Sequence, residues 1–331
     1  MEPIGCSKEI VTLLLFPGAL GDFVCLLPAL RALRDSISGR MVVVARGEWL
    51  ELLQLHDTER LSIDRREIAD LFAAGDELAP ATVALLNGFR HAYSWTGYGD
   101  ANFYRRLGLL GKGSVEIFPF RGMQAGEHAA AYYARCVGVR ESRASTEDLE
   151  SSLRLQSCIA RDQDWLASFV ADHDLSQRRL LVVHPGSGSA KKNWPGFAAA
   201  LALWRRDASA DWVVVELRGP AEPPQARLAD ALRLEGISLK QVAALLTRAD
   251  AYLGNDSGIS HLAGAVGTRG VVVFGPSDPD IWRPLGQTLE ILHRREPCPK
   301  CGDVLCLHRL TPAEVARRIA RVAATASSDI R

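Results

Sequence analysis

The sequence places a carboxylate, Asp22, directly after a tight turn that follows an apolar run. The segment reads "LLLFPGALGD", and Gly18 and Gly21 allow the chain to turn sharply before an amphipathic stretch begins. An acid in the first turn of a helix is stabilised in its ionised form by the helix dipole. Two interpretations follow: Asp22 is a helix-capping acid, or it is a carboxylate base at the floor of a cleft.

A second polar loop, "HPGSGSAKKNWP", combines glycines and serines with two lysines. Gly186 and Ser187 offer backbone N–H groups that an anion can approach closely, and Lys191 and Lys192 add positive charge. This composition suits a phosphate or diphosphate, although neither the Walker A spacing nor the dinucleotide G-x-G-x-x-G spacing is present. The alternative is a generic surface loop.

A third loop, "GNDSGISHLAGAVG", follows a short apolar run and leads into a helix. The Ser257 hydroxyl and the amides of Ser257 and Gly258 are predicted to point at a bound anion, with the helix dipole behind them. Asp256 is predicted either to cap this helix or to accept hydrogen bonds from a sugar. His261 lies one turn further on, and it faces either a cleft or, as an ordinary core histidine, the sheet.

Two further segments carry chemistry-bearing residues. The loop "FGPSDPDIWRPLG" is rich in proline and glycine, which predicts an ordered loop that either completes a site or simply closes a domain. The segment "CPKCGDVLCLH" offers the zinc-ligand types Cys298, Cys301, Cys306 and His308. Structural zinc sites usually separate two ligand pairs by a longer loop, so reduced thiols are favoured here over a zinc cluster.

Strand-like and helical segments alternate along the chain, which predicts an α/β fold of two doubly wound, Rossmann-like domains. In parallel sheets, ligands bind beyond the carboxyl ends of the strands, where the four loops are expected to lie. Strands are predicted at 10–16, 40–46, 81–88, 113–118, 179–184, 211–219, 250–255 and 269–275. Helices are predicted at 22–34, 165–170, 194–206, 223–236, 239–249 and 311–326.

Composition limits the class of protein. With 331 residues, 47% of them hydrophobic and 24% charged, the chain is long enough for two ordinary globular domains. Its 39 basic and 39 acidic residues balance, so no global attraction to nucleic acid is expected. No apolar run is long enough to span a bilayer, and the first ten residues do not resemble a secretory signal. Seven cysteines do not form a disulfide framework, and a cytoplasmic protein is expected.

The segments "GALGDFVCLLPALRAL", "HPGSGSAKKNWP", "GNDSGISHLAGAVG" and "FGPSDP", in this order, resemble the heptosyltransferase family of glycosyltransferases (family 9). The resemblance is strong in the second half and at the N-terminal turn, and poor from about 51 to 175. It implies the GT-B arrangement, in which two Rossmann-like domains face each other across a cleft. The implied domains are an acceptor-binding domain at 1–155, a linker helix region at 156–177 and a nucleotide-sugar-binding domain at 178–310. A closing helix at 311–331 would then pack back on the first domain.

The resemblance also implies roles for individual residues. Asp22 would be the general base that deprotonates the acceptor hydroxyl, and Lys192 would compensate the charge of the leaving diphosphate. Ser257 and Gly258 would add donors at a helix N-terminus. The remaining positions that match the family's donor site are Gly186, Ser187, Glu222, Asp256 and His261, with a loose alignment at Glu222. No Asp-x-Asp metal motif stands in a convincing loop, so no metal cofactor is expected.

These implications predict an inverting enzyme that transfers a heptose or related sugar from an ADP-sugar to a lipopolysaccharide core or similar glycan. The enzyme would be cytoplasmic and would meet the inner membrane only peripherally, through its lipid-linked acceptor. The alternatives are a GT-B nucleotide-sugar epimerase and a non-catalytic nucleotide-sugar-binding paralogue. Departures from the family pattern, such as Phe16 and Pro17 before the first turn, leave the acceptor and the exact donor sugar open. Arg105, Arg106 and Arg121 either meet acceptor phosphates or are solvated surface residues.

Overall fold

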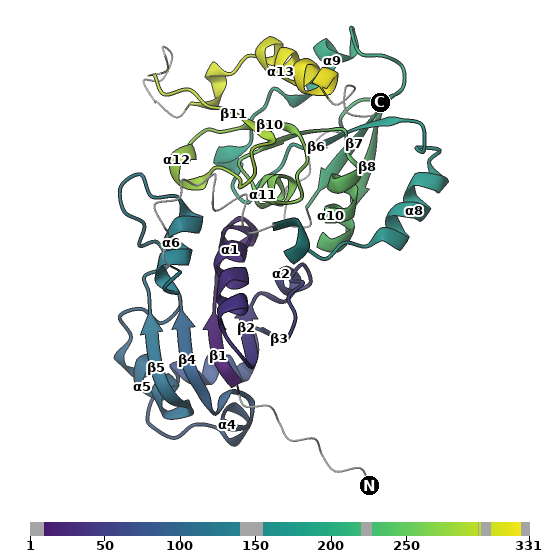
Figure 1. Cartoon of the computed structure of the whole chain (residues 1–331). Helices are drawn as coiled ribbons and strands as arrows, with labels where there is room; N and C mark the ends of the chain where they lie inside the picture. The colour runs from purple at the N-terminus through teal and green to yellow at the C-terminus, as the bar shows by residue number, and fades with distance from the viewer. Residues whose placement is uncertain (1–9, 140–154, 220–226, 297, 299–305, 326–331) are drawn as a thin grey trace.

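The chain folds around two parallel β-sheets, each flanked by helices (Figure 1). The computed structural model describes residues 10–139, 155–219, 227–296, 298 and 306–325. The first sheet contains β1 (Ile10–Leu15), β2 (Arg40–Ala45), β3 (Thr58–Ser62), β4 (Phe89–Ser94) and β5 (Gly111–Ile117). The second contains β6 (Arg179–His184), β7 (Trp212–Arg218), β8 (Ala231–Glu235), β9 (Ala251–Asn255), β10 (Gly270–Val273) and β11 (Leu289–Leu292).

Helices connect these strands. In the first part they are α1 (Leu20–Ser36), α2 (Gly47–Leu50), α3 (Arg66–Ala69), η1 (Asp70–Phe72), α4 (Pro80–Leu86), α5 (Ala101–Leu110) and α6 (Ala129–Cys136). Then follow η2 (Leu155–Cys158), α8 (Gln163–Asp172), η3 (Ala190–Lys192), α9 (Phe197–Arg205), α10 (Leu239–Arg248), α11 (Gly258–Ala265), α12 (Pro279–Trp282), η4 (Leu307–Arg309) and α13 (Pro312–Thr325). The α8 helix includes the helix expected at 165–170. The domain limits expected at 155, 177 and 310 stay predictions.

Both sheets are doubly wound, and the order of their strands shows where a ligand can bind. The first sheet runs β3-β2-β1-β4-β5, so the chain changes direction between β1 and β4. The second runs β11-β10-β9-β6-β7-β8, with the change between β6 and β9. Crevices in α/β proteins form at such switch points, beyond the carboxyl ends of the strands. The loops after β1, β6 and β9, which sequence analysis singled out, all follow strands at the switch points.

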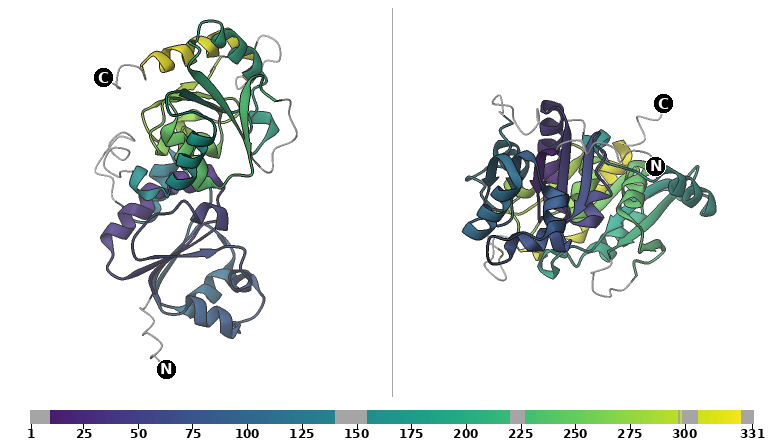
Figure 2. Two further views of the ribbon diagram at one scale, coloured as in Figure 1. Left: turned by 90° about the vertical axis from the view of Figure 1, so that its right-hand side faces the viewer. Right: turned by 90° about the horizontal axis from the view of Figure 1, so that it is seen from below.

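The two sheets meet through the first turns of α1 and α11, whose N-terminal ends lie together between the sheets (Figures 1 and 2). Two glycines permit this approach. A Cβ atom on Gly258 would lie 2.7 Å from the Leu20 Cβ, and one on Gly21 would lie 3.0 Å from the His261 ring. The loop after β1 and the loop after β9 are therefore held in direct contact, although they belong to different sheets.

Three expectations about secondary structure and packing are wrong. Residues 81–88 were expected to be a strand but belong mostly to α4, which starts with a proline in its first turn, where proline is favoured. Within 223–236, expected to be a helix, β8 forms an edge strand on β7. The closing helix α13 does not pack back on the first domain: its buried Val315 and Ile319 pack with Trp194 and Phe197 on the second sheet's layer (Figure 1).

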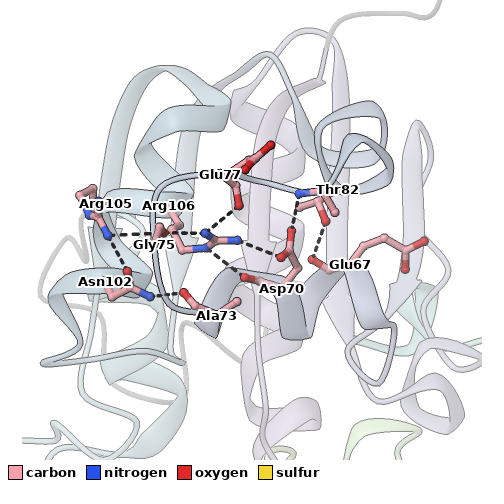
Figure 3. Close-up of polar contacts among 10 residues, drawn as sticks. Glu67, Asp70, Ala73, Gly75, Glu77, Thr82, Asn102, Arg105 and Arg106 are labelled. Atoms are coloured by element: carbon pink, nitrogen blue, oxygen red, sulfur yellow. Dashed lines mark hydrogen bonds and ion pairs between the residues drawn. The ribbon is translucent and has the colours of Figure 1, made fainter.

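One buried arginine, Arg106, connects α5 to the segment 70–79 of the first domain. The Arg106 side chain on α5 is fully buried, and its guanidinium forms an ion pair with Asp70 at 2.8 Å (Figure 3). It also donates to the backbone carbonyls of Asp70 at 3.0 Å, Gly75 at 2.6 Å and Glu77 at 3.0 Å. Arg106 is therefore a structural residue that ties the 70–79 loop to α5, and the expectation that it meets acceptor phosphates or is solvated is wrong.

Replacing Arg106 should destabilise the fold strongly. Arg106→Ala leaves Asp70 and three carbonyl groups without their donor, and breaking a buried ion pair from one side costs about 3–5 kcal/mol. The neighbouring Arg105 is largely exposed and pairs with exposed Asp76, so Arg105→Ala should change the free energy of unfolding by less than about 1 kcal/mol. Urea unfolding of both variants measures the difference, and equal losses of stability would contradict the structural role of Arg106.

Among the described residues, no helix combines the length and the apolar character that crossing a membrane requires.

Candidate active site

A cavity of about 360 Å³ lies where the loops after β1, β6 and β9 meet. Its lining combines residues of both domains: Ala19, Gly21, Asp22, Arg121, Gly188, Ser189, Lys192, Asp256, Ser257, Gly258, His261, Ser277 and Trp282. Seven site residues predicted from sequence are thus brought together across the contact between the two sheets: Gly21, Asp22, Lys192, Asp256, Ser257, Gly258 and His261. The cavity contains two acids and two cations, which is the charge pattern that the predicted chemistry requires.

Asp22 is both a capping residue and a cavity residue, so the two interpretations of its role are compatible. It occupies the first turn of α1, and its Oδ2 accepts a hydrogen bond from the Ala19 amide at 3.1 Å. Burial raises the pKa of the Asp22 carboxyl above its ordinary value, while the Ala19 amide, Arg121 and Lys192 act in the opposite direction. The hydrogen bond orients the carboxylate, which can still accept further hydrogen bonds in the cavity that Asp22 lines.

Lys192 and Asp256 form an ion pair inside the cavity. The Lys192 Nζ lies 2.6 Å from the Asp256 Oδ2, and the Asp256 side chain is 4% exposed. Lys192 ends the short η3 turn, and Asp256 follows β9. The pair therefore joins the loops at the second sheet's switch point and holds the ammonium group at a fixed place near the N-terminus of α11.

The N-terminus of α11 faces the same cavity. Ser257 caps the helix by accepting a hydrogen bond from the Ser260 amide at 3.3 Å, and His184 Nδ1 lies 3.2 Å from the Ser257 hydroxyl. The amides of the first turn carry partial positive charge, which attracts an anion together with Lys192. The side chain of Ser257 is thus partly used within the protein, and the backbone amides are the stronger candidates for anion contacts.

His261 links the two domains beside Asp22. Its Nδ1 lies 3.5 Å from the Cys25 Sγ on α1, and both side chains are buried. Burial lowers the pKa of His261 well below its ordinary value, although Asp256 acts in the opposite direction, so the ring is neutral at neutral pH. Burial, followed by the charges of Asp22 and Asp256, raises the pKa of the Cys25 thiol. His261 is therefore a neutral cavity residue held by a thiol from the other domain.

Sequence reasoning missed two residues of the cavity lining and left a third undecided. Trp282 and Ser277 belong to the fourth loop, which was noted as a segment without assigning these side chains. Arg121 follows β5, and its guanidinium carbon lies 5.4 Å from the centre of the Trp282 ring, which belongs to the other domain. Of the three arginines considered for the acceptor, only Arg121 lines this cavity.

Other predicted site residues lie elsewhere. Gly18 and Gly186 do not line the cavity, and the backbone carbonyl of Gly18 accepts from the Trp49 indole at 3.0 Å. Ser187 also lies outside the lining, and its hydroxyl lies 2.7 Å from both the Ser189 carbonyl oxygen and the Asn193 Oδ1, either of which can accept its hydrogen. Gly188 and Ser189 line the cavity instead. Glu222 lies outside the described residues.

The cysteine cluster is only partly described. Cys298 is buried, Cys306 is half-buried and His308 belongs to η4, whereas Cys301 lies outside the described residues. Within the part of the chain that the structure covers, no three His, Cys, Asp or Glu side chains gather closely enough to hold a metal ion.

A larger cavity of about 640 Å³ lies between α9 and α13, with Arg179, Trp204 and Trp212 in its lining. Arg179 and Trp212 are the first residues of β6 and β7, so this cavity lies at the amino ends of the strands. Ligands of doubly wound sheets bind at the opposite, carboxyl ends. The smaller cavity at the switch points is therefore the candidate active site.

Comparisons with known proteins relate the chain to one glycosyltransferase family. A family model for glycosyltransferase family 9 (heptosyltransferase) matches residues 139–310, just over half of the chain. Lipopolysaccharide heptosyltransferase 1 of Pseudomonas aeruginosa is 26% identical over 211 residues, or 58% of this chain and 56% of that protein. The chain thus aligns with little more than half the length of this curated relative.

Solved structures share the fold over nearly the whole chain. A family 9 glycosyl transferase from Veillonella parvula has a TM-score of 0.69 at 18% identity, covering 96% of this chain and 97% of that one. The Escherichia coli heptosyltransferase WaaC with ADP has a TM-score of 0.64 at 17% identity, covering 95% and 100%. The two facing sheets are thus the GT-B arrangement, as predicted from the sequence. With a family model matching most of its second half, the chain belongs to glycosyltransferase family 9, the heptosyltransferases.

Proposed function

We propose that this chain is an inverting heptosyltransferase that transfers a heptose, or a related sugar, from an ADP-sugar to a lipopolysaccharide-type glycan. One observation carries the proposal: the Asp22 carboxylate of one domain shares a single cavity with Lys192 and the α11 N-terminus of the other. A base and a diphosphate site that share one cavity are what a sugar transfer by direct displacement requires. Family membership supports the reaction class.

In the proposed reaction, the Asp22 carboxylate takes the proton of an acceptor hydroxyl. The acceptor oxygen forms a bond to the anomeric carbon as the bond from that carbon to the diphosphate oxygen breaks, and the electron pair leaves with ADP. Attack from the face opposite the leaving group inverts the anomeric configuration. The raised pKa of Asp22 brings the base closer to the working pH, which makes proton transfer more effective.

The negative charge that develops on the diphosphate is proposed to be compensated by the protein itself. Lys192 supplies a full positive charge, and the first amides of α11 supply hydrogen-bond donors along the helix dipole. Asp256 orients the Lys192 ammonium group and is also a candidate to accept hydrogen bonds from the sugar. We therefore propose that transfer needs no divalent metal, and that the cysteine segment takes no part in the chemistry.

The acceptor is proposed to enter from the first domain. Arg121 borders the cavity on that side and is the arginine placed to meet an acceptor phosphate or carboxylate. A lipid-linked acceptor would bring the enzyme to the cytoplasmic face of the inner membrane by peripheral contact. The nucleotide sugar and the glycan are thus the proposed partners.

The pH dependence of transfer should report on Asp22. The base acts only when ionised, so kcat/KM should fall on acidification around a pKa above the ordinary carboxylate value of 3.8. Arg121 lowers this pKa, so Arg121→Gln should move the acid limb of the profile to higher pH. An acid limb that stays in place in Arg121→Gln would contradict the coupling between the two side chains.

Calorimetric titration of the purified chain with ADP, UDP and GDP, with and without EDTA, tests the proposed donor. We expect a preference for ADP that EDTA does not change. A preference for UDP would favour another donor or an epimerase, and loss of ADP binding in EDTA would contradict metal independence. ADP binding without any transfer would point to a non-catalytic paralogue.

A further inference from the structure

Besides the candidate active site and the cavity between α9 and α13, a cavity of about 330 Å³ lies in the first domain, beside the β4–β5 edge of the sheet and α6. It is termed the second cavity, the candidate active site being the first. This volume falls in the range of small-molecule sites, roughly 300–1,000 Å³. Its lining is Tyr93, Glu116, Phe118, Pro119, Gly122, Tyr132, Arg135, Cys136 and Gly138. Tyr93 and Glu116 are paired in register near the carboxyl ends of β4 and β5, the side of a parallel sheet where ligands bind.

Two polar groups of this cavity are available to a ligand. Within the described part of the chain, neither the Tyr93 hydroxyl nor the Glu116 carboxylate has a hydrogen-bond or ion-pair partner in the protein. Tyr93 is half-buried, and its pKa is raised by burial and then by the nearby charge of Glu116, so it remains a neutral hydroxyl that can donate. A carboxylate accepts hydrogen bonds only, so the two groups together offer one donor and several acceptors.

The rest of the lining combines one partly exposed aromatic ring with groups that are fixed in place. Phe118 contributes ring surface, whereas Tyr132 is buried and its hydroxyl donates to the Pro119 carbonyl. The Arg135 guanidinium lies 5.3 Å from the centre of the Tyr132 ring and is held by Glu127 through contacts of 2.8 Å. Because Glu127 already neutralises Arg135, the cavity offers no unpaired cation to an anionic ligand.

This combination fits a carbohydrate ring. A sugar presents apolar C–H faces that pack on aromatic rings and hydroxyl groups that donate to a carboxylate. An anionic ligand would be repelled by the Glu116 carboxylate, while the Arg135 guanidinium in the same lining is already paired with Glu127. The cavity therefore suits a neutral sugar unit, in contrast to the Arg121 side of the candidate active site.

The second cavity adjoins the candidate active site. Arg121 lines the active-site cavity and the next residue, Gly122, lines the second one. A Cβ on Gly122 would lie 2.6 Å from the Tyr132 hydroxyl oxygen, so a glycine is required at this close approach. The two cavities are therefore lined by consecutive residues of the loop after β5, whose Cα atoms are about 3.8 Å apart.

We propose that the second cavity is an acceptor subsite that binds the sugar unit next to the one that is glycosylated. This inference rests on the proposed function, because it is the acceptor glycan that would extend from Asp22 past Arg121 into the cavity. Tyr93 and Glu116 bind the hydroxyl groups of this sugar, and Phe118 packs against its ring. The subsite makes an oligosaccharide a better acceptor than its terminal sugar alone.

Calorimetry with two probes tests the subsite: a deacylated lipopolysaccharide core oligosaccharide, and its terminal monosaccharide alone. We expect the wild type to bind the oligosaccharide at least about tenfold more tightly. Glu116→Gln and Tyr93→Phe should each weaken oligosaccharide binding by about five- to tenfold and leave monosaccharide binding unchanged. Tyr104→Phe removes an exposed hydroxyl outside the cavity and is the matched control.

The outcomes separate the subsite from the proposed function. Unchanged oligosaccharide affinity in both cavity variants would overturn the subsite, as would the absence of oligosaccharide binding to the wild type. Variant-sensitive oligosaccharide binding by a protein that transfers no heptose from ADP-heptose would uphold the subsite and contradict the proposed function. In a protein that transfers heptose, the same variants should raise KM for the oligosaccharide with kcat little changed.

Discussion

Asp22→Asn should reduce transfer by about 10²–10⁴-fold, the contribution of a positioned general base. Asparagine is nearly the same size as aspartate, and its side-chain oxygen can still accept the hydrogen bond that the Ala19 amide donates at 3.1 Å. The α1 cap should therefore persist, and the protein should stay folded. What the substitution removes is the ability to take a proton from the acceptor hydroxyl.

The nucleotide site should be little affected by this change. Lys192, Asp256 and the α11 N-terminus all belong to the second domain, so ADP affinity should stay within a few-fold of the wild type. Asp35→Asn is the matched control, because Asp35 lies on the same helix and forms an exposed ion pair with Arg31. An Asp22→Asn variant that keeps the wild-type rate would remove Asp22 from the mechanism.

Lys192→Ala should lower kcat by about 10²–10³-fold, as does the loss of one group that stabilises developing negative charge. It should also weaken ADP binding, by about tenfold. The structure adds a second cause to the one expected from sequence: without the ammonium group, the buried Asp256 carboxylate has lost its ion-pair partner and repels the diphosphate. Lys192→Arg keeps the charge and should restore part of the affinity.

The chain offers a matched control for this prediction in the adjacent Lys191. It carries the same charge one residue away, but it is exposed and outside the cavity lining. Lys191→Ala should leave both ADP affinity and kcat near the wild-type values. Equal effects of the two substitutions would show that general positive charge, and not the Lys192–Asp256 pair, attracts the nucleotide.

The sequence was most informative where strands are buried on both faces. The strands β1, β2, β6 and β10 each contain a run of buried apolar residues, and sequence analysis located all four. It missed β3, an edge strand with the sequence "TERLS" in which only Leu61 is buried. It also took β8 for a helix, because "ALRLE" is made of good helix formers. There the tertiary structure overrides propensity: Arg233 forms an ion pair with the buried Glu216 of β7.

The candidate site could be predicted as a set of loops but not as a set of contacts. Glycine spacing and the position of Asp22 after a strand indicated the correct loops, because loops at the carboxyl ends of parallel strands converge. The contact between Cys25 and His261 joins residues 236 positions apart, and no local pattern predicts it. Among three arginines in similar polar surroundings, only the fold distinguishes Arg121 at the cavity from Arg106 in the core.

The most direct test of the proposed reaction is acceptor-dependent release of ADP from ADP-heptose, followed by NMR of the product's anomeric configuration. The wild type should release ADP only when the deacylated core oligosaccharide is present, with EDTA in the buffer, and the new linkage should be inverted relative to the donor. Asp22→Asn should release almost none. Retained configuration, ADP release without acceptor, or full activity in Asp22→Asn would contradict a direct displacement assisted by Asp22.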